Sequence, residues 1–334
     1  MPAGKERVAE IIDFSMLHGD DSACEVYEID KTTLDRYRRV YKHNEKAKVI
    51  NDDKKHGEFN WREWTNMMIR HQDLHEKASW SQDQATIEIK TEYPCIVYKP
   101  MADQHLGSIG TNYETFTKIT DLFLTIPYLY GSLLGDENDN FVSFKNQLAV
   151  LQQIISPEEQ DEFVESWLLE ITPKLLFSTF GNHSAFEERV SGKNALKKIL
   201  NRNMIYFNGI GICNLKINNQ TYKIVVTHKT PQHSTVNLTH GLKQLARKEI
   251  PDADIYLEGH YHIPAVEVAF ERGLFQVFMV LGTLKQNDGY AKRGFSYFTA
   301  DKDGAIVFDS TQHRVIPFPC LDDALEFARL KNGA

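Results

Sequence analysis

The chain has 334 residues, of which 42% are hydrophobic, and its formal net charge at pH 7 is -8. Such a chain can bury one large core beside a small accessory domain, and its charge argues against wholesale binding of phosphate backbones without excluding a local basic patch. Its apolar runs fall short of the roughly 20 residues that span a bilayer, and its N-terminus lacks the plan of a signal peptide. We therefore expect a cytoplasmic protein without membrane association.

Residues 1–48 are predicted to form a small all-helical domain. The apolar spacing predicts helices at residues 5–19, 22–29 and 31–42. This arrangement resembles a helix-turn-helix, whose two paired helices pack through a few small and apolar positions. In this sequence those positions would be Cys24, Ile29, Leu34 and Tyr37.

A helix-turn-helix binds DNA through its second paired helix. The exposed residues of that helix would be Lys31, Thr32, Thr33, Arg36, Arg38 and Arg39. One departure is Glu28, which stands where such motifs usually have a glycine at the turn, and a residue with a Cβ is less comfortable there. The alternative is a three-helix cap with a solvated basic face, and a short helical motif does not decide between the two.

Residues 49–84 are predicted to form a linker followed by a connector helix. The linker is polar and contains glycine, and the helix that follows has amphipathic spacing. We expect Trp61, Trp64 and Met68 to form its packed stripe.

Residues 85–334 alternate short β-type runs with helical stretches, which predicts a layered α/β domain. In such sheets, functional side chains gather in loops at the carboxyl ends of the strands. The expected strands cover residues 85–90, 95–99, 174–180, 222–227, 253–258, 274–281, 296–300 and 305–309.

Five short motifs rich in Asp, Asn and His occur in this domain, four of them directly after a strand-like run. Each residue alone could be a buried, hydrogen-bonded histidine or a turn-capping aspartate. Together they supply the hard oxygen donors and imidazoles that two neighbouring divalent ions require, and they contain no cysteine for a thiolate site. The motifs are Asp103-Gln104-His105, Gly135-Asp136-Glu137-Asn138-Asp139, Gly181-Asn182-His183, His228 and Gly259-His260-Tyr261-His262.

The series D-x-H, G-D-x-x-D, G-N-H, H and G-H-x-H resembles the signature of the calcineurin-like metallophosphoesterases, and it covers residues 95–265. The resemblance implies a four-layer α-β-β-α sandwich. It also implies two divalent metal ions, with Asp136 bridging them. One ion would be bound by Asp103, His105 and His262, and the other by Asn182, His228 and His260.

The same resemblance implies metal-assisted hydrolysis of a phosphoester, in which the ions activate water and polarise the phosphoryl oxygens. Manganese is the expected ion, with iron, zinc and magnesium as alternatives, and no small organic cofactor is expected. His183 resembles the family's catalytic histidine, and Asp139 would orient it. Ser184 departs from the family, many of whose members have an acidic residue directly after G-N-H.

The first hypothesis for the substrate is a phosphodiester in DNA, cleaved by a nuclease. It depends on the helix-turn-helix resemblance, the basic stretch at residues 31–48, and a motif set that also resembles double-strand-break repair nucleases. Residues 263–334 are too few for the separate DNA-capping domain of such nucleases. The alternatives are a phosphomonoesterase acting on phosphoprotein or nucleotide, and a non-catalytic scaffold associated with DNA. Whether the chain forms a homo-oligomer stays open.

Overall fold

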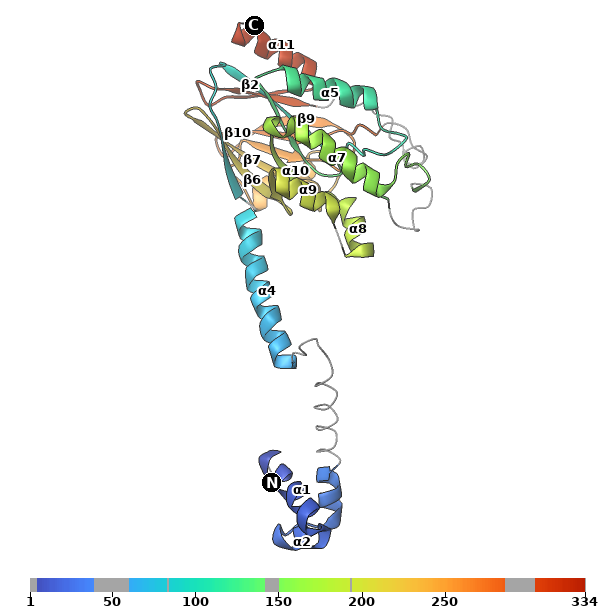
Figure 1. Cartoon of the computed structure of the whole chain (residues 1–334). Coiled ribbons are helices and arrows are strands. Elements are labelled where there is room, and N and C mark those ends of the chain that lie inside the picture. Colours follow the sequence, from blue (N-terminus) through green and yellow to red (C-terminus); the bar gives the residue numbers. More distant parts are fainter. Residues whose placement is uncertain are drawn as a thin grey trace. The chain divides into compact units, whose positions relative to one another are not determined.

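The structure is a computed structural model that describes residues 5–38, 60–82, 84–141, 150–192, 194–285 and 304–333. The chain divides into two compact units, Met1–Leu74 and His75–Ala334, and some elements of each are labelled in Figure 1. The division falls inside helix α4 (Trp61–Gln82), so the domain boundaries after residues 48 and 84 stay a prediction. The strand expected at residues 296–300 lies outside the described residues.

The first unit contains helices α1 (Lys5–His18) and α2 (Asp20–Val26), and residues 31–38 are helical as well. Glu28, at the turn between the last two helices, has a φ of 52°, in the left-handed region that a glycine adopts without strain. The packing positions expected from the sequence do lie in the core of this unit. That core contains Ile11, Ala23 and Leu34, with Phe14, Cys24, Tyr27, Ile29 and Tyr37 packed against it.

Arg38 does not lie on an exposed face as predicted. Its guanidinium donates to both carboxylate oxygens of Asp20 and to the hydroxyl of Ser15, and its side chain is half-buried. This ion pair joins the third helix to α2, so Arg38 stabilises the unit instead of pointing into solvent. Of the other predicted DNA contacts, Thr33 is half-buried and Arg39 lies outside the described residues, whereas Lys31, Thr32 and Arg36 are exposed.

Helix α4 begins after Asn60, whose side-chain oxygen accepts hydrogen bonds from the backbone N–H groups of Arg62 and Glu63. The packed stripe predicted on this helix is wrong, because Trp61, Trp64 and Met68 are 67%, 48% and 52% exposed. Amphipathic spacing fixes which side chains share a helix face, but it does not determine whether another element covers that face.

The second unit contains two six-stranded sheets. In both, the central strands run parallel: β2 to β5 in one sheet and β7, β8 and β10 in the other. The first sheet has the order β1 (Gln84–Ile89), β6 (Gly211–Ile217), β7 (Gln220–Thr227), β8 (Ile255–Glu258), β10 (Leu274–Val280) and β9 (Ala265–Glu271). The second has the order β12 (Val315–Phe318), β11 (Ala305–Asp309), β2 (Cys95–Met101), β3 (Leu129–Leu133), β4 (Leu175–Thr179) and β5 (Ile205–Phe207).

Helices cover the outer faces of both sheets. Apolar residues of α5 (Tyr113–Thr125), α7 (Pro157–Ile171), α9 (Ala195–Asn203) and α11 (Leu321–Asn332) pack on the second sheet, and those of α10 (His240–Lys248) pack on the first. Helices α5 and α7 lie side by side (Figure 1). A third apolar cluster fills the space between the sheets. The layers are therefore α-β-β-α, as predicted.

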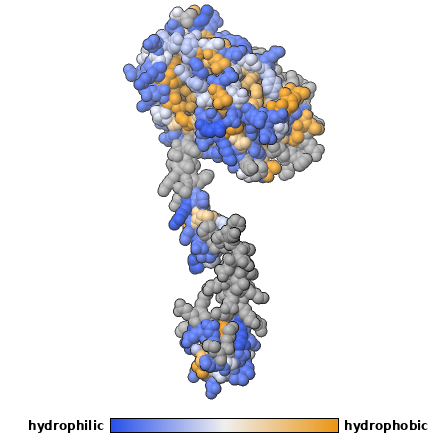
Figure 2. Space-filling view, in the orientation of Figure 1, coloured by the Kyte–Doolittle hydropathy of each residue, from blue (hydrophilic) through white to orange (hydrophobic). Residues whose placement is uncertain are grey.

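The visible face of the second unit is mostly hydrophilic, with apolar patches between the polar side chains (Figure 2). Among the described residues, no helix combines the length and the apolar character needed to cross a membrane.

We expect Phe177→Ala to lower the free energy of unfolding by about 3–5 kcal/mol, because it empties a buried volume that the two sheets cannot close. Phe177 is fully buried between the sheets, where its ring lies 5.5 Å from that of Phe207. The control is Phe270→Ala on β9, whose side chain is 80% exposed and whose loss should cost less than about 0.5 kcal/mol. Urea unfolding measures both, and equal losses would contradict the assigned core.

Candidate metal centre

All five motifs follow strands of the two parallel regions. The first three come after β2, β3 and β4, which are neighbours in one sheet, and the last two come after β7 and β8 in the other. The loops are joined directly, because the backbone N–H of His105 donates to the main-chain oxygen of Asp136 at 3.0 Å. The N–H of His260 donates to Asp103 Oδ2 at 2.7 Å, which ties the edges of the two sheets together.

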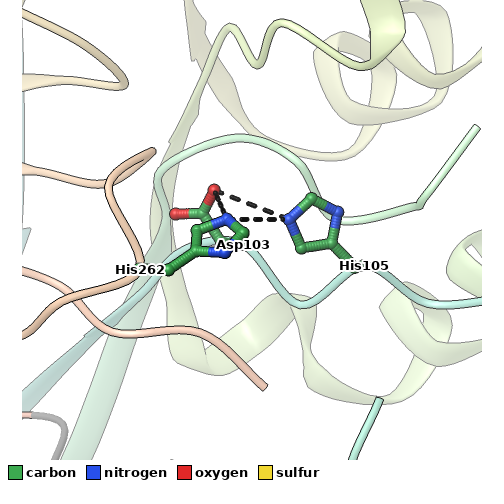
Figure 3. A group of neighbouring side chains, drawn as sticks. All are labelled: Asp103, His105 and His262. Carbon is green, nitrogen blue, oxygen red and sulfur yellow. Dashed lines mark hydrogen bonds and ion pairs between the residues drawn. The ribbon is translucent and has the colours of Figure 1, made fainter. Parts of the chain in front are cut away.

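A first group of side chains consists of Asp103, His105 and His262 (Figure 3). His262 Nε2 lies 3.2 Å from Asp103 Oδ1 and 3.1 Å from His105 Nε2. Asp103 and His105 are buried, whereas His262 keeps 30% of its side chain exposed. Three donor atoms thus converge on one point that is open on the His262 side.

A second group consists of Asp136, His228 and His260. His228 Nε2 lies 3.1 Å from Asp136 Oδ2 and 2.9 Å from the side-chain oxygen of Asn182. The four residues assigned to this side of the centre by the sequence are therefore brought together. The structure groups Asp136 with His228 and His260, and its role as a bridge between two ions stays a prediction.

His183 and Asp139 are in contact, but not in the way that the sequence suggested. His183 Nδ1 lies 2.5 Å from the main-chain oxygen of Asp139, and His183 Nε2 faces Asp136 Oδ2 at 3.8 Å. The Asp139 carboxylate points elsewhere: its Oδ1 lies 3.2 Å from His105 Nδ1 and 2.7 Å from Lys285 Nζ. Asp139 therefore contacts His183 through its main-chain oxygen and contacts His105 and Lys285 through its carboxylate.

Sequence reasoning missed Lys285. It is buried beside the site and follows β10, beyond the last of the five motifs. No motif marks it, and its only signal in the sequence is a position a few residues after the carboxyl end of an apolar strand.

Five of the seven predicted metal ligands have positive φ angles: Asp103 (53°), His105 (49°), Asp136 (56°), His260 (70°) and His262 (61°). Such a backbone costs about 1–3 kcal/mol for each non-glycine residue and is concentrated at functional sites. The loops can adopt it because neighbouring glycines allow close approach. A Cβ on Gly181 would lie 2.2 Å from the backbone nitrogen of Asp136, so only glycine fits there.

The buried charges shift one another's pKa values. Burial raises the pKa of Asp136, but His228 and His183 outweigh this and hold it well below its usual value. Burial lowers the pKa of His228, but Asp136 raises it to about 10. Burial lowers the pKa of His105 to about 4, with the neighbouring His183 adding to the effect, and burial likewise lowers the pKa of His260 to about 4. His105 and His260 are therefore neutral at neutral pH, with a lone pair available.

In each group the possible ligand atoms lie within 4.8 Å of one another. Carboxylate oxygens and neutral imidazole nitrogens are ligands that divalent transition ions accept, so this donor set fits such ions. Two six-stranded sheets between helix layers, with these groups at the carboxyl ends of parallel strands, form the α-β-β-α sandwich that the resemblance to calcineurin-like metallophosphoesterases implied.

No protein-family model matches the sequence, and no curated protein matches it either. Vacuolar Protein Sorting 29 from Cryptosporidium parvum is a similar solved structure, with 17% identity over 68% of this chain and 98% of that chain and a TM-score of 0.35. A conserved uncharacterized protein from Streptococcus pneumoniae, a predicted phosphoesterase, has 13% identity over 67% of this chain and 97% of that chain, with a TM-score of 0.32. Wild-type Vps29 from Entamoeba histolytica, complexed with Zn²⁺, has 12% identity over 67% and 97% of the two chains and a TM-score of 0.29.

A pH-dependent contribution to stability is expected from Asp161, which accepts a hydrogen bond from Asn138 Nδ2 at 2.7 Å. Burial and, next, the nearby Glu187 raise the pKa of Asp161 from 3.8 to about 7. The folded state therefore binds a proton at the Asp161 carboxyl more tightly than the unfolded state does. The stability that this proton contributes is lost as the pH rises from about 4 to about 7. Over that window wild type should lose stability relative to Asp161→Asn in urea unfolding.

The control for this measurement is Asp252→Asn, because Lys223 lowers the pKa of Asp252 and keeps it ionised in the same window. Its difference from wild type should stay flat there. A flat difference for Asp161→Asn as well would show that the Asp161 carboxyl does not titrate as expected.

Proposed function

We propose that this chain is a metal-dependent phosphoesterase. The observation that carries the proposal is the convergence of two Asp/His groups where the edges of the two sheets meet. Several of these residues have a strained backbone, and the carboxylates of both groups are buried. One divalent ion would be held by Asp103, His105 and His262, and the other by Asn182, His228 and His260, with Asp136 shared between them. Such ions supply Lewis-acid stabilisation of phosphoryl oxygens and activate water for attack. Manganese is the ion we propose, with iron, zinc and magnesium as alternatives.

His183 would act on the substrate through Nε2. Its Nδ1 is held on the Asp139 carbonyl, so Nδ1 carries the proton, and Nε2 can donate to a leaving oxygen only when the imidazole is protonated. The rings of Phe141 and Phe186 lie 4.7 and 5.1 Å from the His183 ring and keep it facing the centre. Ser184 stands where the family often has an acidic residue. Its hydroxyl donates to the main-chain oxygen of Gly181 at 2.9 Å and so stabilises the turn.

A phosphodiester in DNA is the substrate that we propose first. The support is the helix-turn-helix-like packing of the first unit. The described residues 5–38 carry five Lys and Arg side chains against nine Asp and Glu, so binding to DNA would depend on exposed residues of the third helix and on the basic residues that follow it. With Arg38 engaged internally, the proposed contacts are Lys31, Thr32, Arg36 and Arg39. A phosphomonoester of a phosphoprotein or a nucleotide is the alternative substrate.

Hydrolysis of bis-para-nitrophenyl phosphate and para-nitrophenyl phosphate with Mn²⁺ tests the activity. His183→Ala should lower kcat about 100- to 10,000-fold, because it removes the general acid while leaving the metal groups in place. The control is His313→Ala, at a histidine whose side chain is 50% exposed and which pairs with Asp254, away from the motifs. Preference for the diester supports the nuclease, and preference for the monoester supports a phosphatase. Bound metal without hydrolysis of either ester would sink the enzyme proposal and favour a scaffold.

Binding to duplex DNA tests the first unit separately. Arg36→Ala should weaken binding at low salt and reduce the slope of log affinity against log salt by about 1, because one phosphate contact is lost. The matched control is Arg329→Ala, on the exposed side of α11. If a chain lacking residues 1–50 bound DNA as tightly as the full chain at the same salt, the helix-turn-helix proposal would be wrong.

A further inference from the structure

Lys285 is a buried lysine at the candidate metal centre, with only 8% of its surface exposed. Its Nζ donates to Asp139 Oδ1 at 2.7 Å and lies 5.3 Å from the centroid of the Phe141 ring. A buried ammonium is costly unless a charged partner compensates it, and the ion pair with Asp139 supplies such compensation. Conversely, removing the ammonium would leave the fully buried Asp139 carboxylate without this partner.

Asp139 lies between two residues of the site. Its Oδ1, which accepts a hydrogen bond from Lys285 Nζ, also lies 3.2 Å from His105 Nδ1. Its main-chain oxygen lies 2.5 Å from His183 Nδ1. His105 directs its other ring nitrogen, Nε2, toward Asp103 and His262. Rotation of the Asp139 carboxylate would therefore disturb His105, a predicted metal ligand, whereas only a shift of the Asp139 backbone would disturb His183.

The segment Thr283-Leu284-Lys285 is itself anchored on the first group. The Thr283 hydroxyl donates to the main-chain oxygen of Asp103 at 2.7 Å and accepts from the backbone N–H of Lys285 at 2.9 Å. The N–H of Leu284 donates to the same Asp103 oxygen at 3.3 Å. Lys285 thus approaches Asp139 from a backbone that is fixed to Asp103, a residue with a strained φ of 53°.

We propose that Lys285 is a positioning residue of the metal centre, which acts by holding the Asp139 carboxylate against His105 Nδ1. A carboxylate on the outer nitrogen of a metal-binding histidine fixes the orientation of the ring and raises its basicity, and its loss costs about 10- to 100-fold in metal affinity or activity. The effect on hydrolysis rests on the proposed function, whereas the effect on ion affinity requires only that the first group binds a metal.

Calorimetric titration of the full chain with Mn²⁺ tests this role. Lys285→Met keeps the length of the side chain and removes the charge, so the affinity for one of the two ions should fall about tenfold or more. The kcat on bis-para-nitrophenyl phosphate should fall with it while KM changes little, because the loss acts through the ion that His105 would hold. Lys285→Arg should recover part of both, since it restores a cation at the same place.

The matched control is Lys99→Met, the same substitution at a second buried lysine, whose Nζ donates to the main-chain oxygen of Gly304 at 3.2 Å. It should keep both ion affinities. Wild-type affinities in Lys285→Met would overturn the inference. If wild type bound two ions without hydrolysing either ester, the proposed function would fail. The role of Lys285 would then be tested only by comparing the ion affinities of Lys285→Met and wild type.

A double-substituted chain covers the case in which Lys285→Met does not fold. Asp139→Asn with Lys285→Met removes both buried charges together, so neither is left uncompensated. Because Lys285 is inferred to act through Asp139, the double variant should bind the ion as Asp139→Asn alone does. Losses that add up independently would overturn the inference.

Discussion

The organisation of the second unit depends on the burial of two carboxylates, Asp103 and Asp136, where the carboxyl edges of its sheets meet. A buried carboxylate is tolerated only with compensating donors, and here imidazoles and backbone N–H groups from both sheets supply them. The loops must then bring donors close together, which forces both aspartates into the left-handed region and requires glycine at Gly181. Strain, burial and charge thus coincide at one place in the fold.

The imidazoles around these carboxylates do not behave alike. His105 and His260 are neutral near physiological pH because burial disfavours their charged form, whereas His228 keeps a proton because Asp136 faces it. The same residue type thus provides both neutral donors and a local positive charge. A divalent ion would take over the charge compensation that the His228 proton provides, and this is why the donor set fits a cation.

The first unit separates packing from function. Its helices meet through the positions expected of a helix-turn-helix, and Glu28 adopts the backbone that a glycine would have there. The charge of this unit does not match that resemblance. Arg38 is held by Asp20, and acidic residues outnumber basic ones among residues 5–38. Helical periodicity predicts which residues share a face, but whether a basic side chain reaches solvent depends on the neighbours that folding supplies.

The sequence by itself determined the α/β class, all seven predicted strands that lie within the described residues, and the five motifs. These depend on local periodicity and on residue chemistry. The expected strands did not include β3, β5, β6, β9 and β12. Among these, β9 is an edge strand of alternating exposed and half-buried residues, which no continuous apolar run marks. Only the tertiary structure decided that Asp139 meets His183 through its main-chain oxygen and meets His105 and Lys285 through its carboxylate. Asp139 and Lys285 are 146 residues apart in the chain. Their contact exists only after β3 and β10, which belong to different sheets, have brought their carboxyl ends to the place where the two sheets meet.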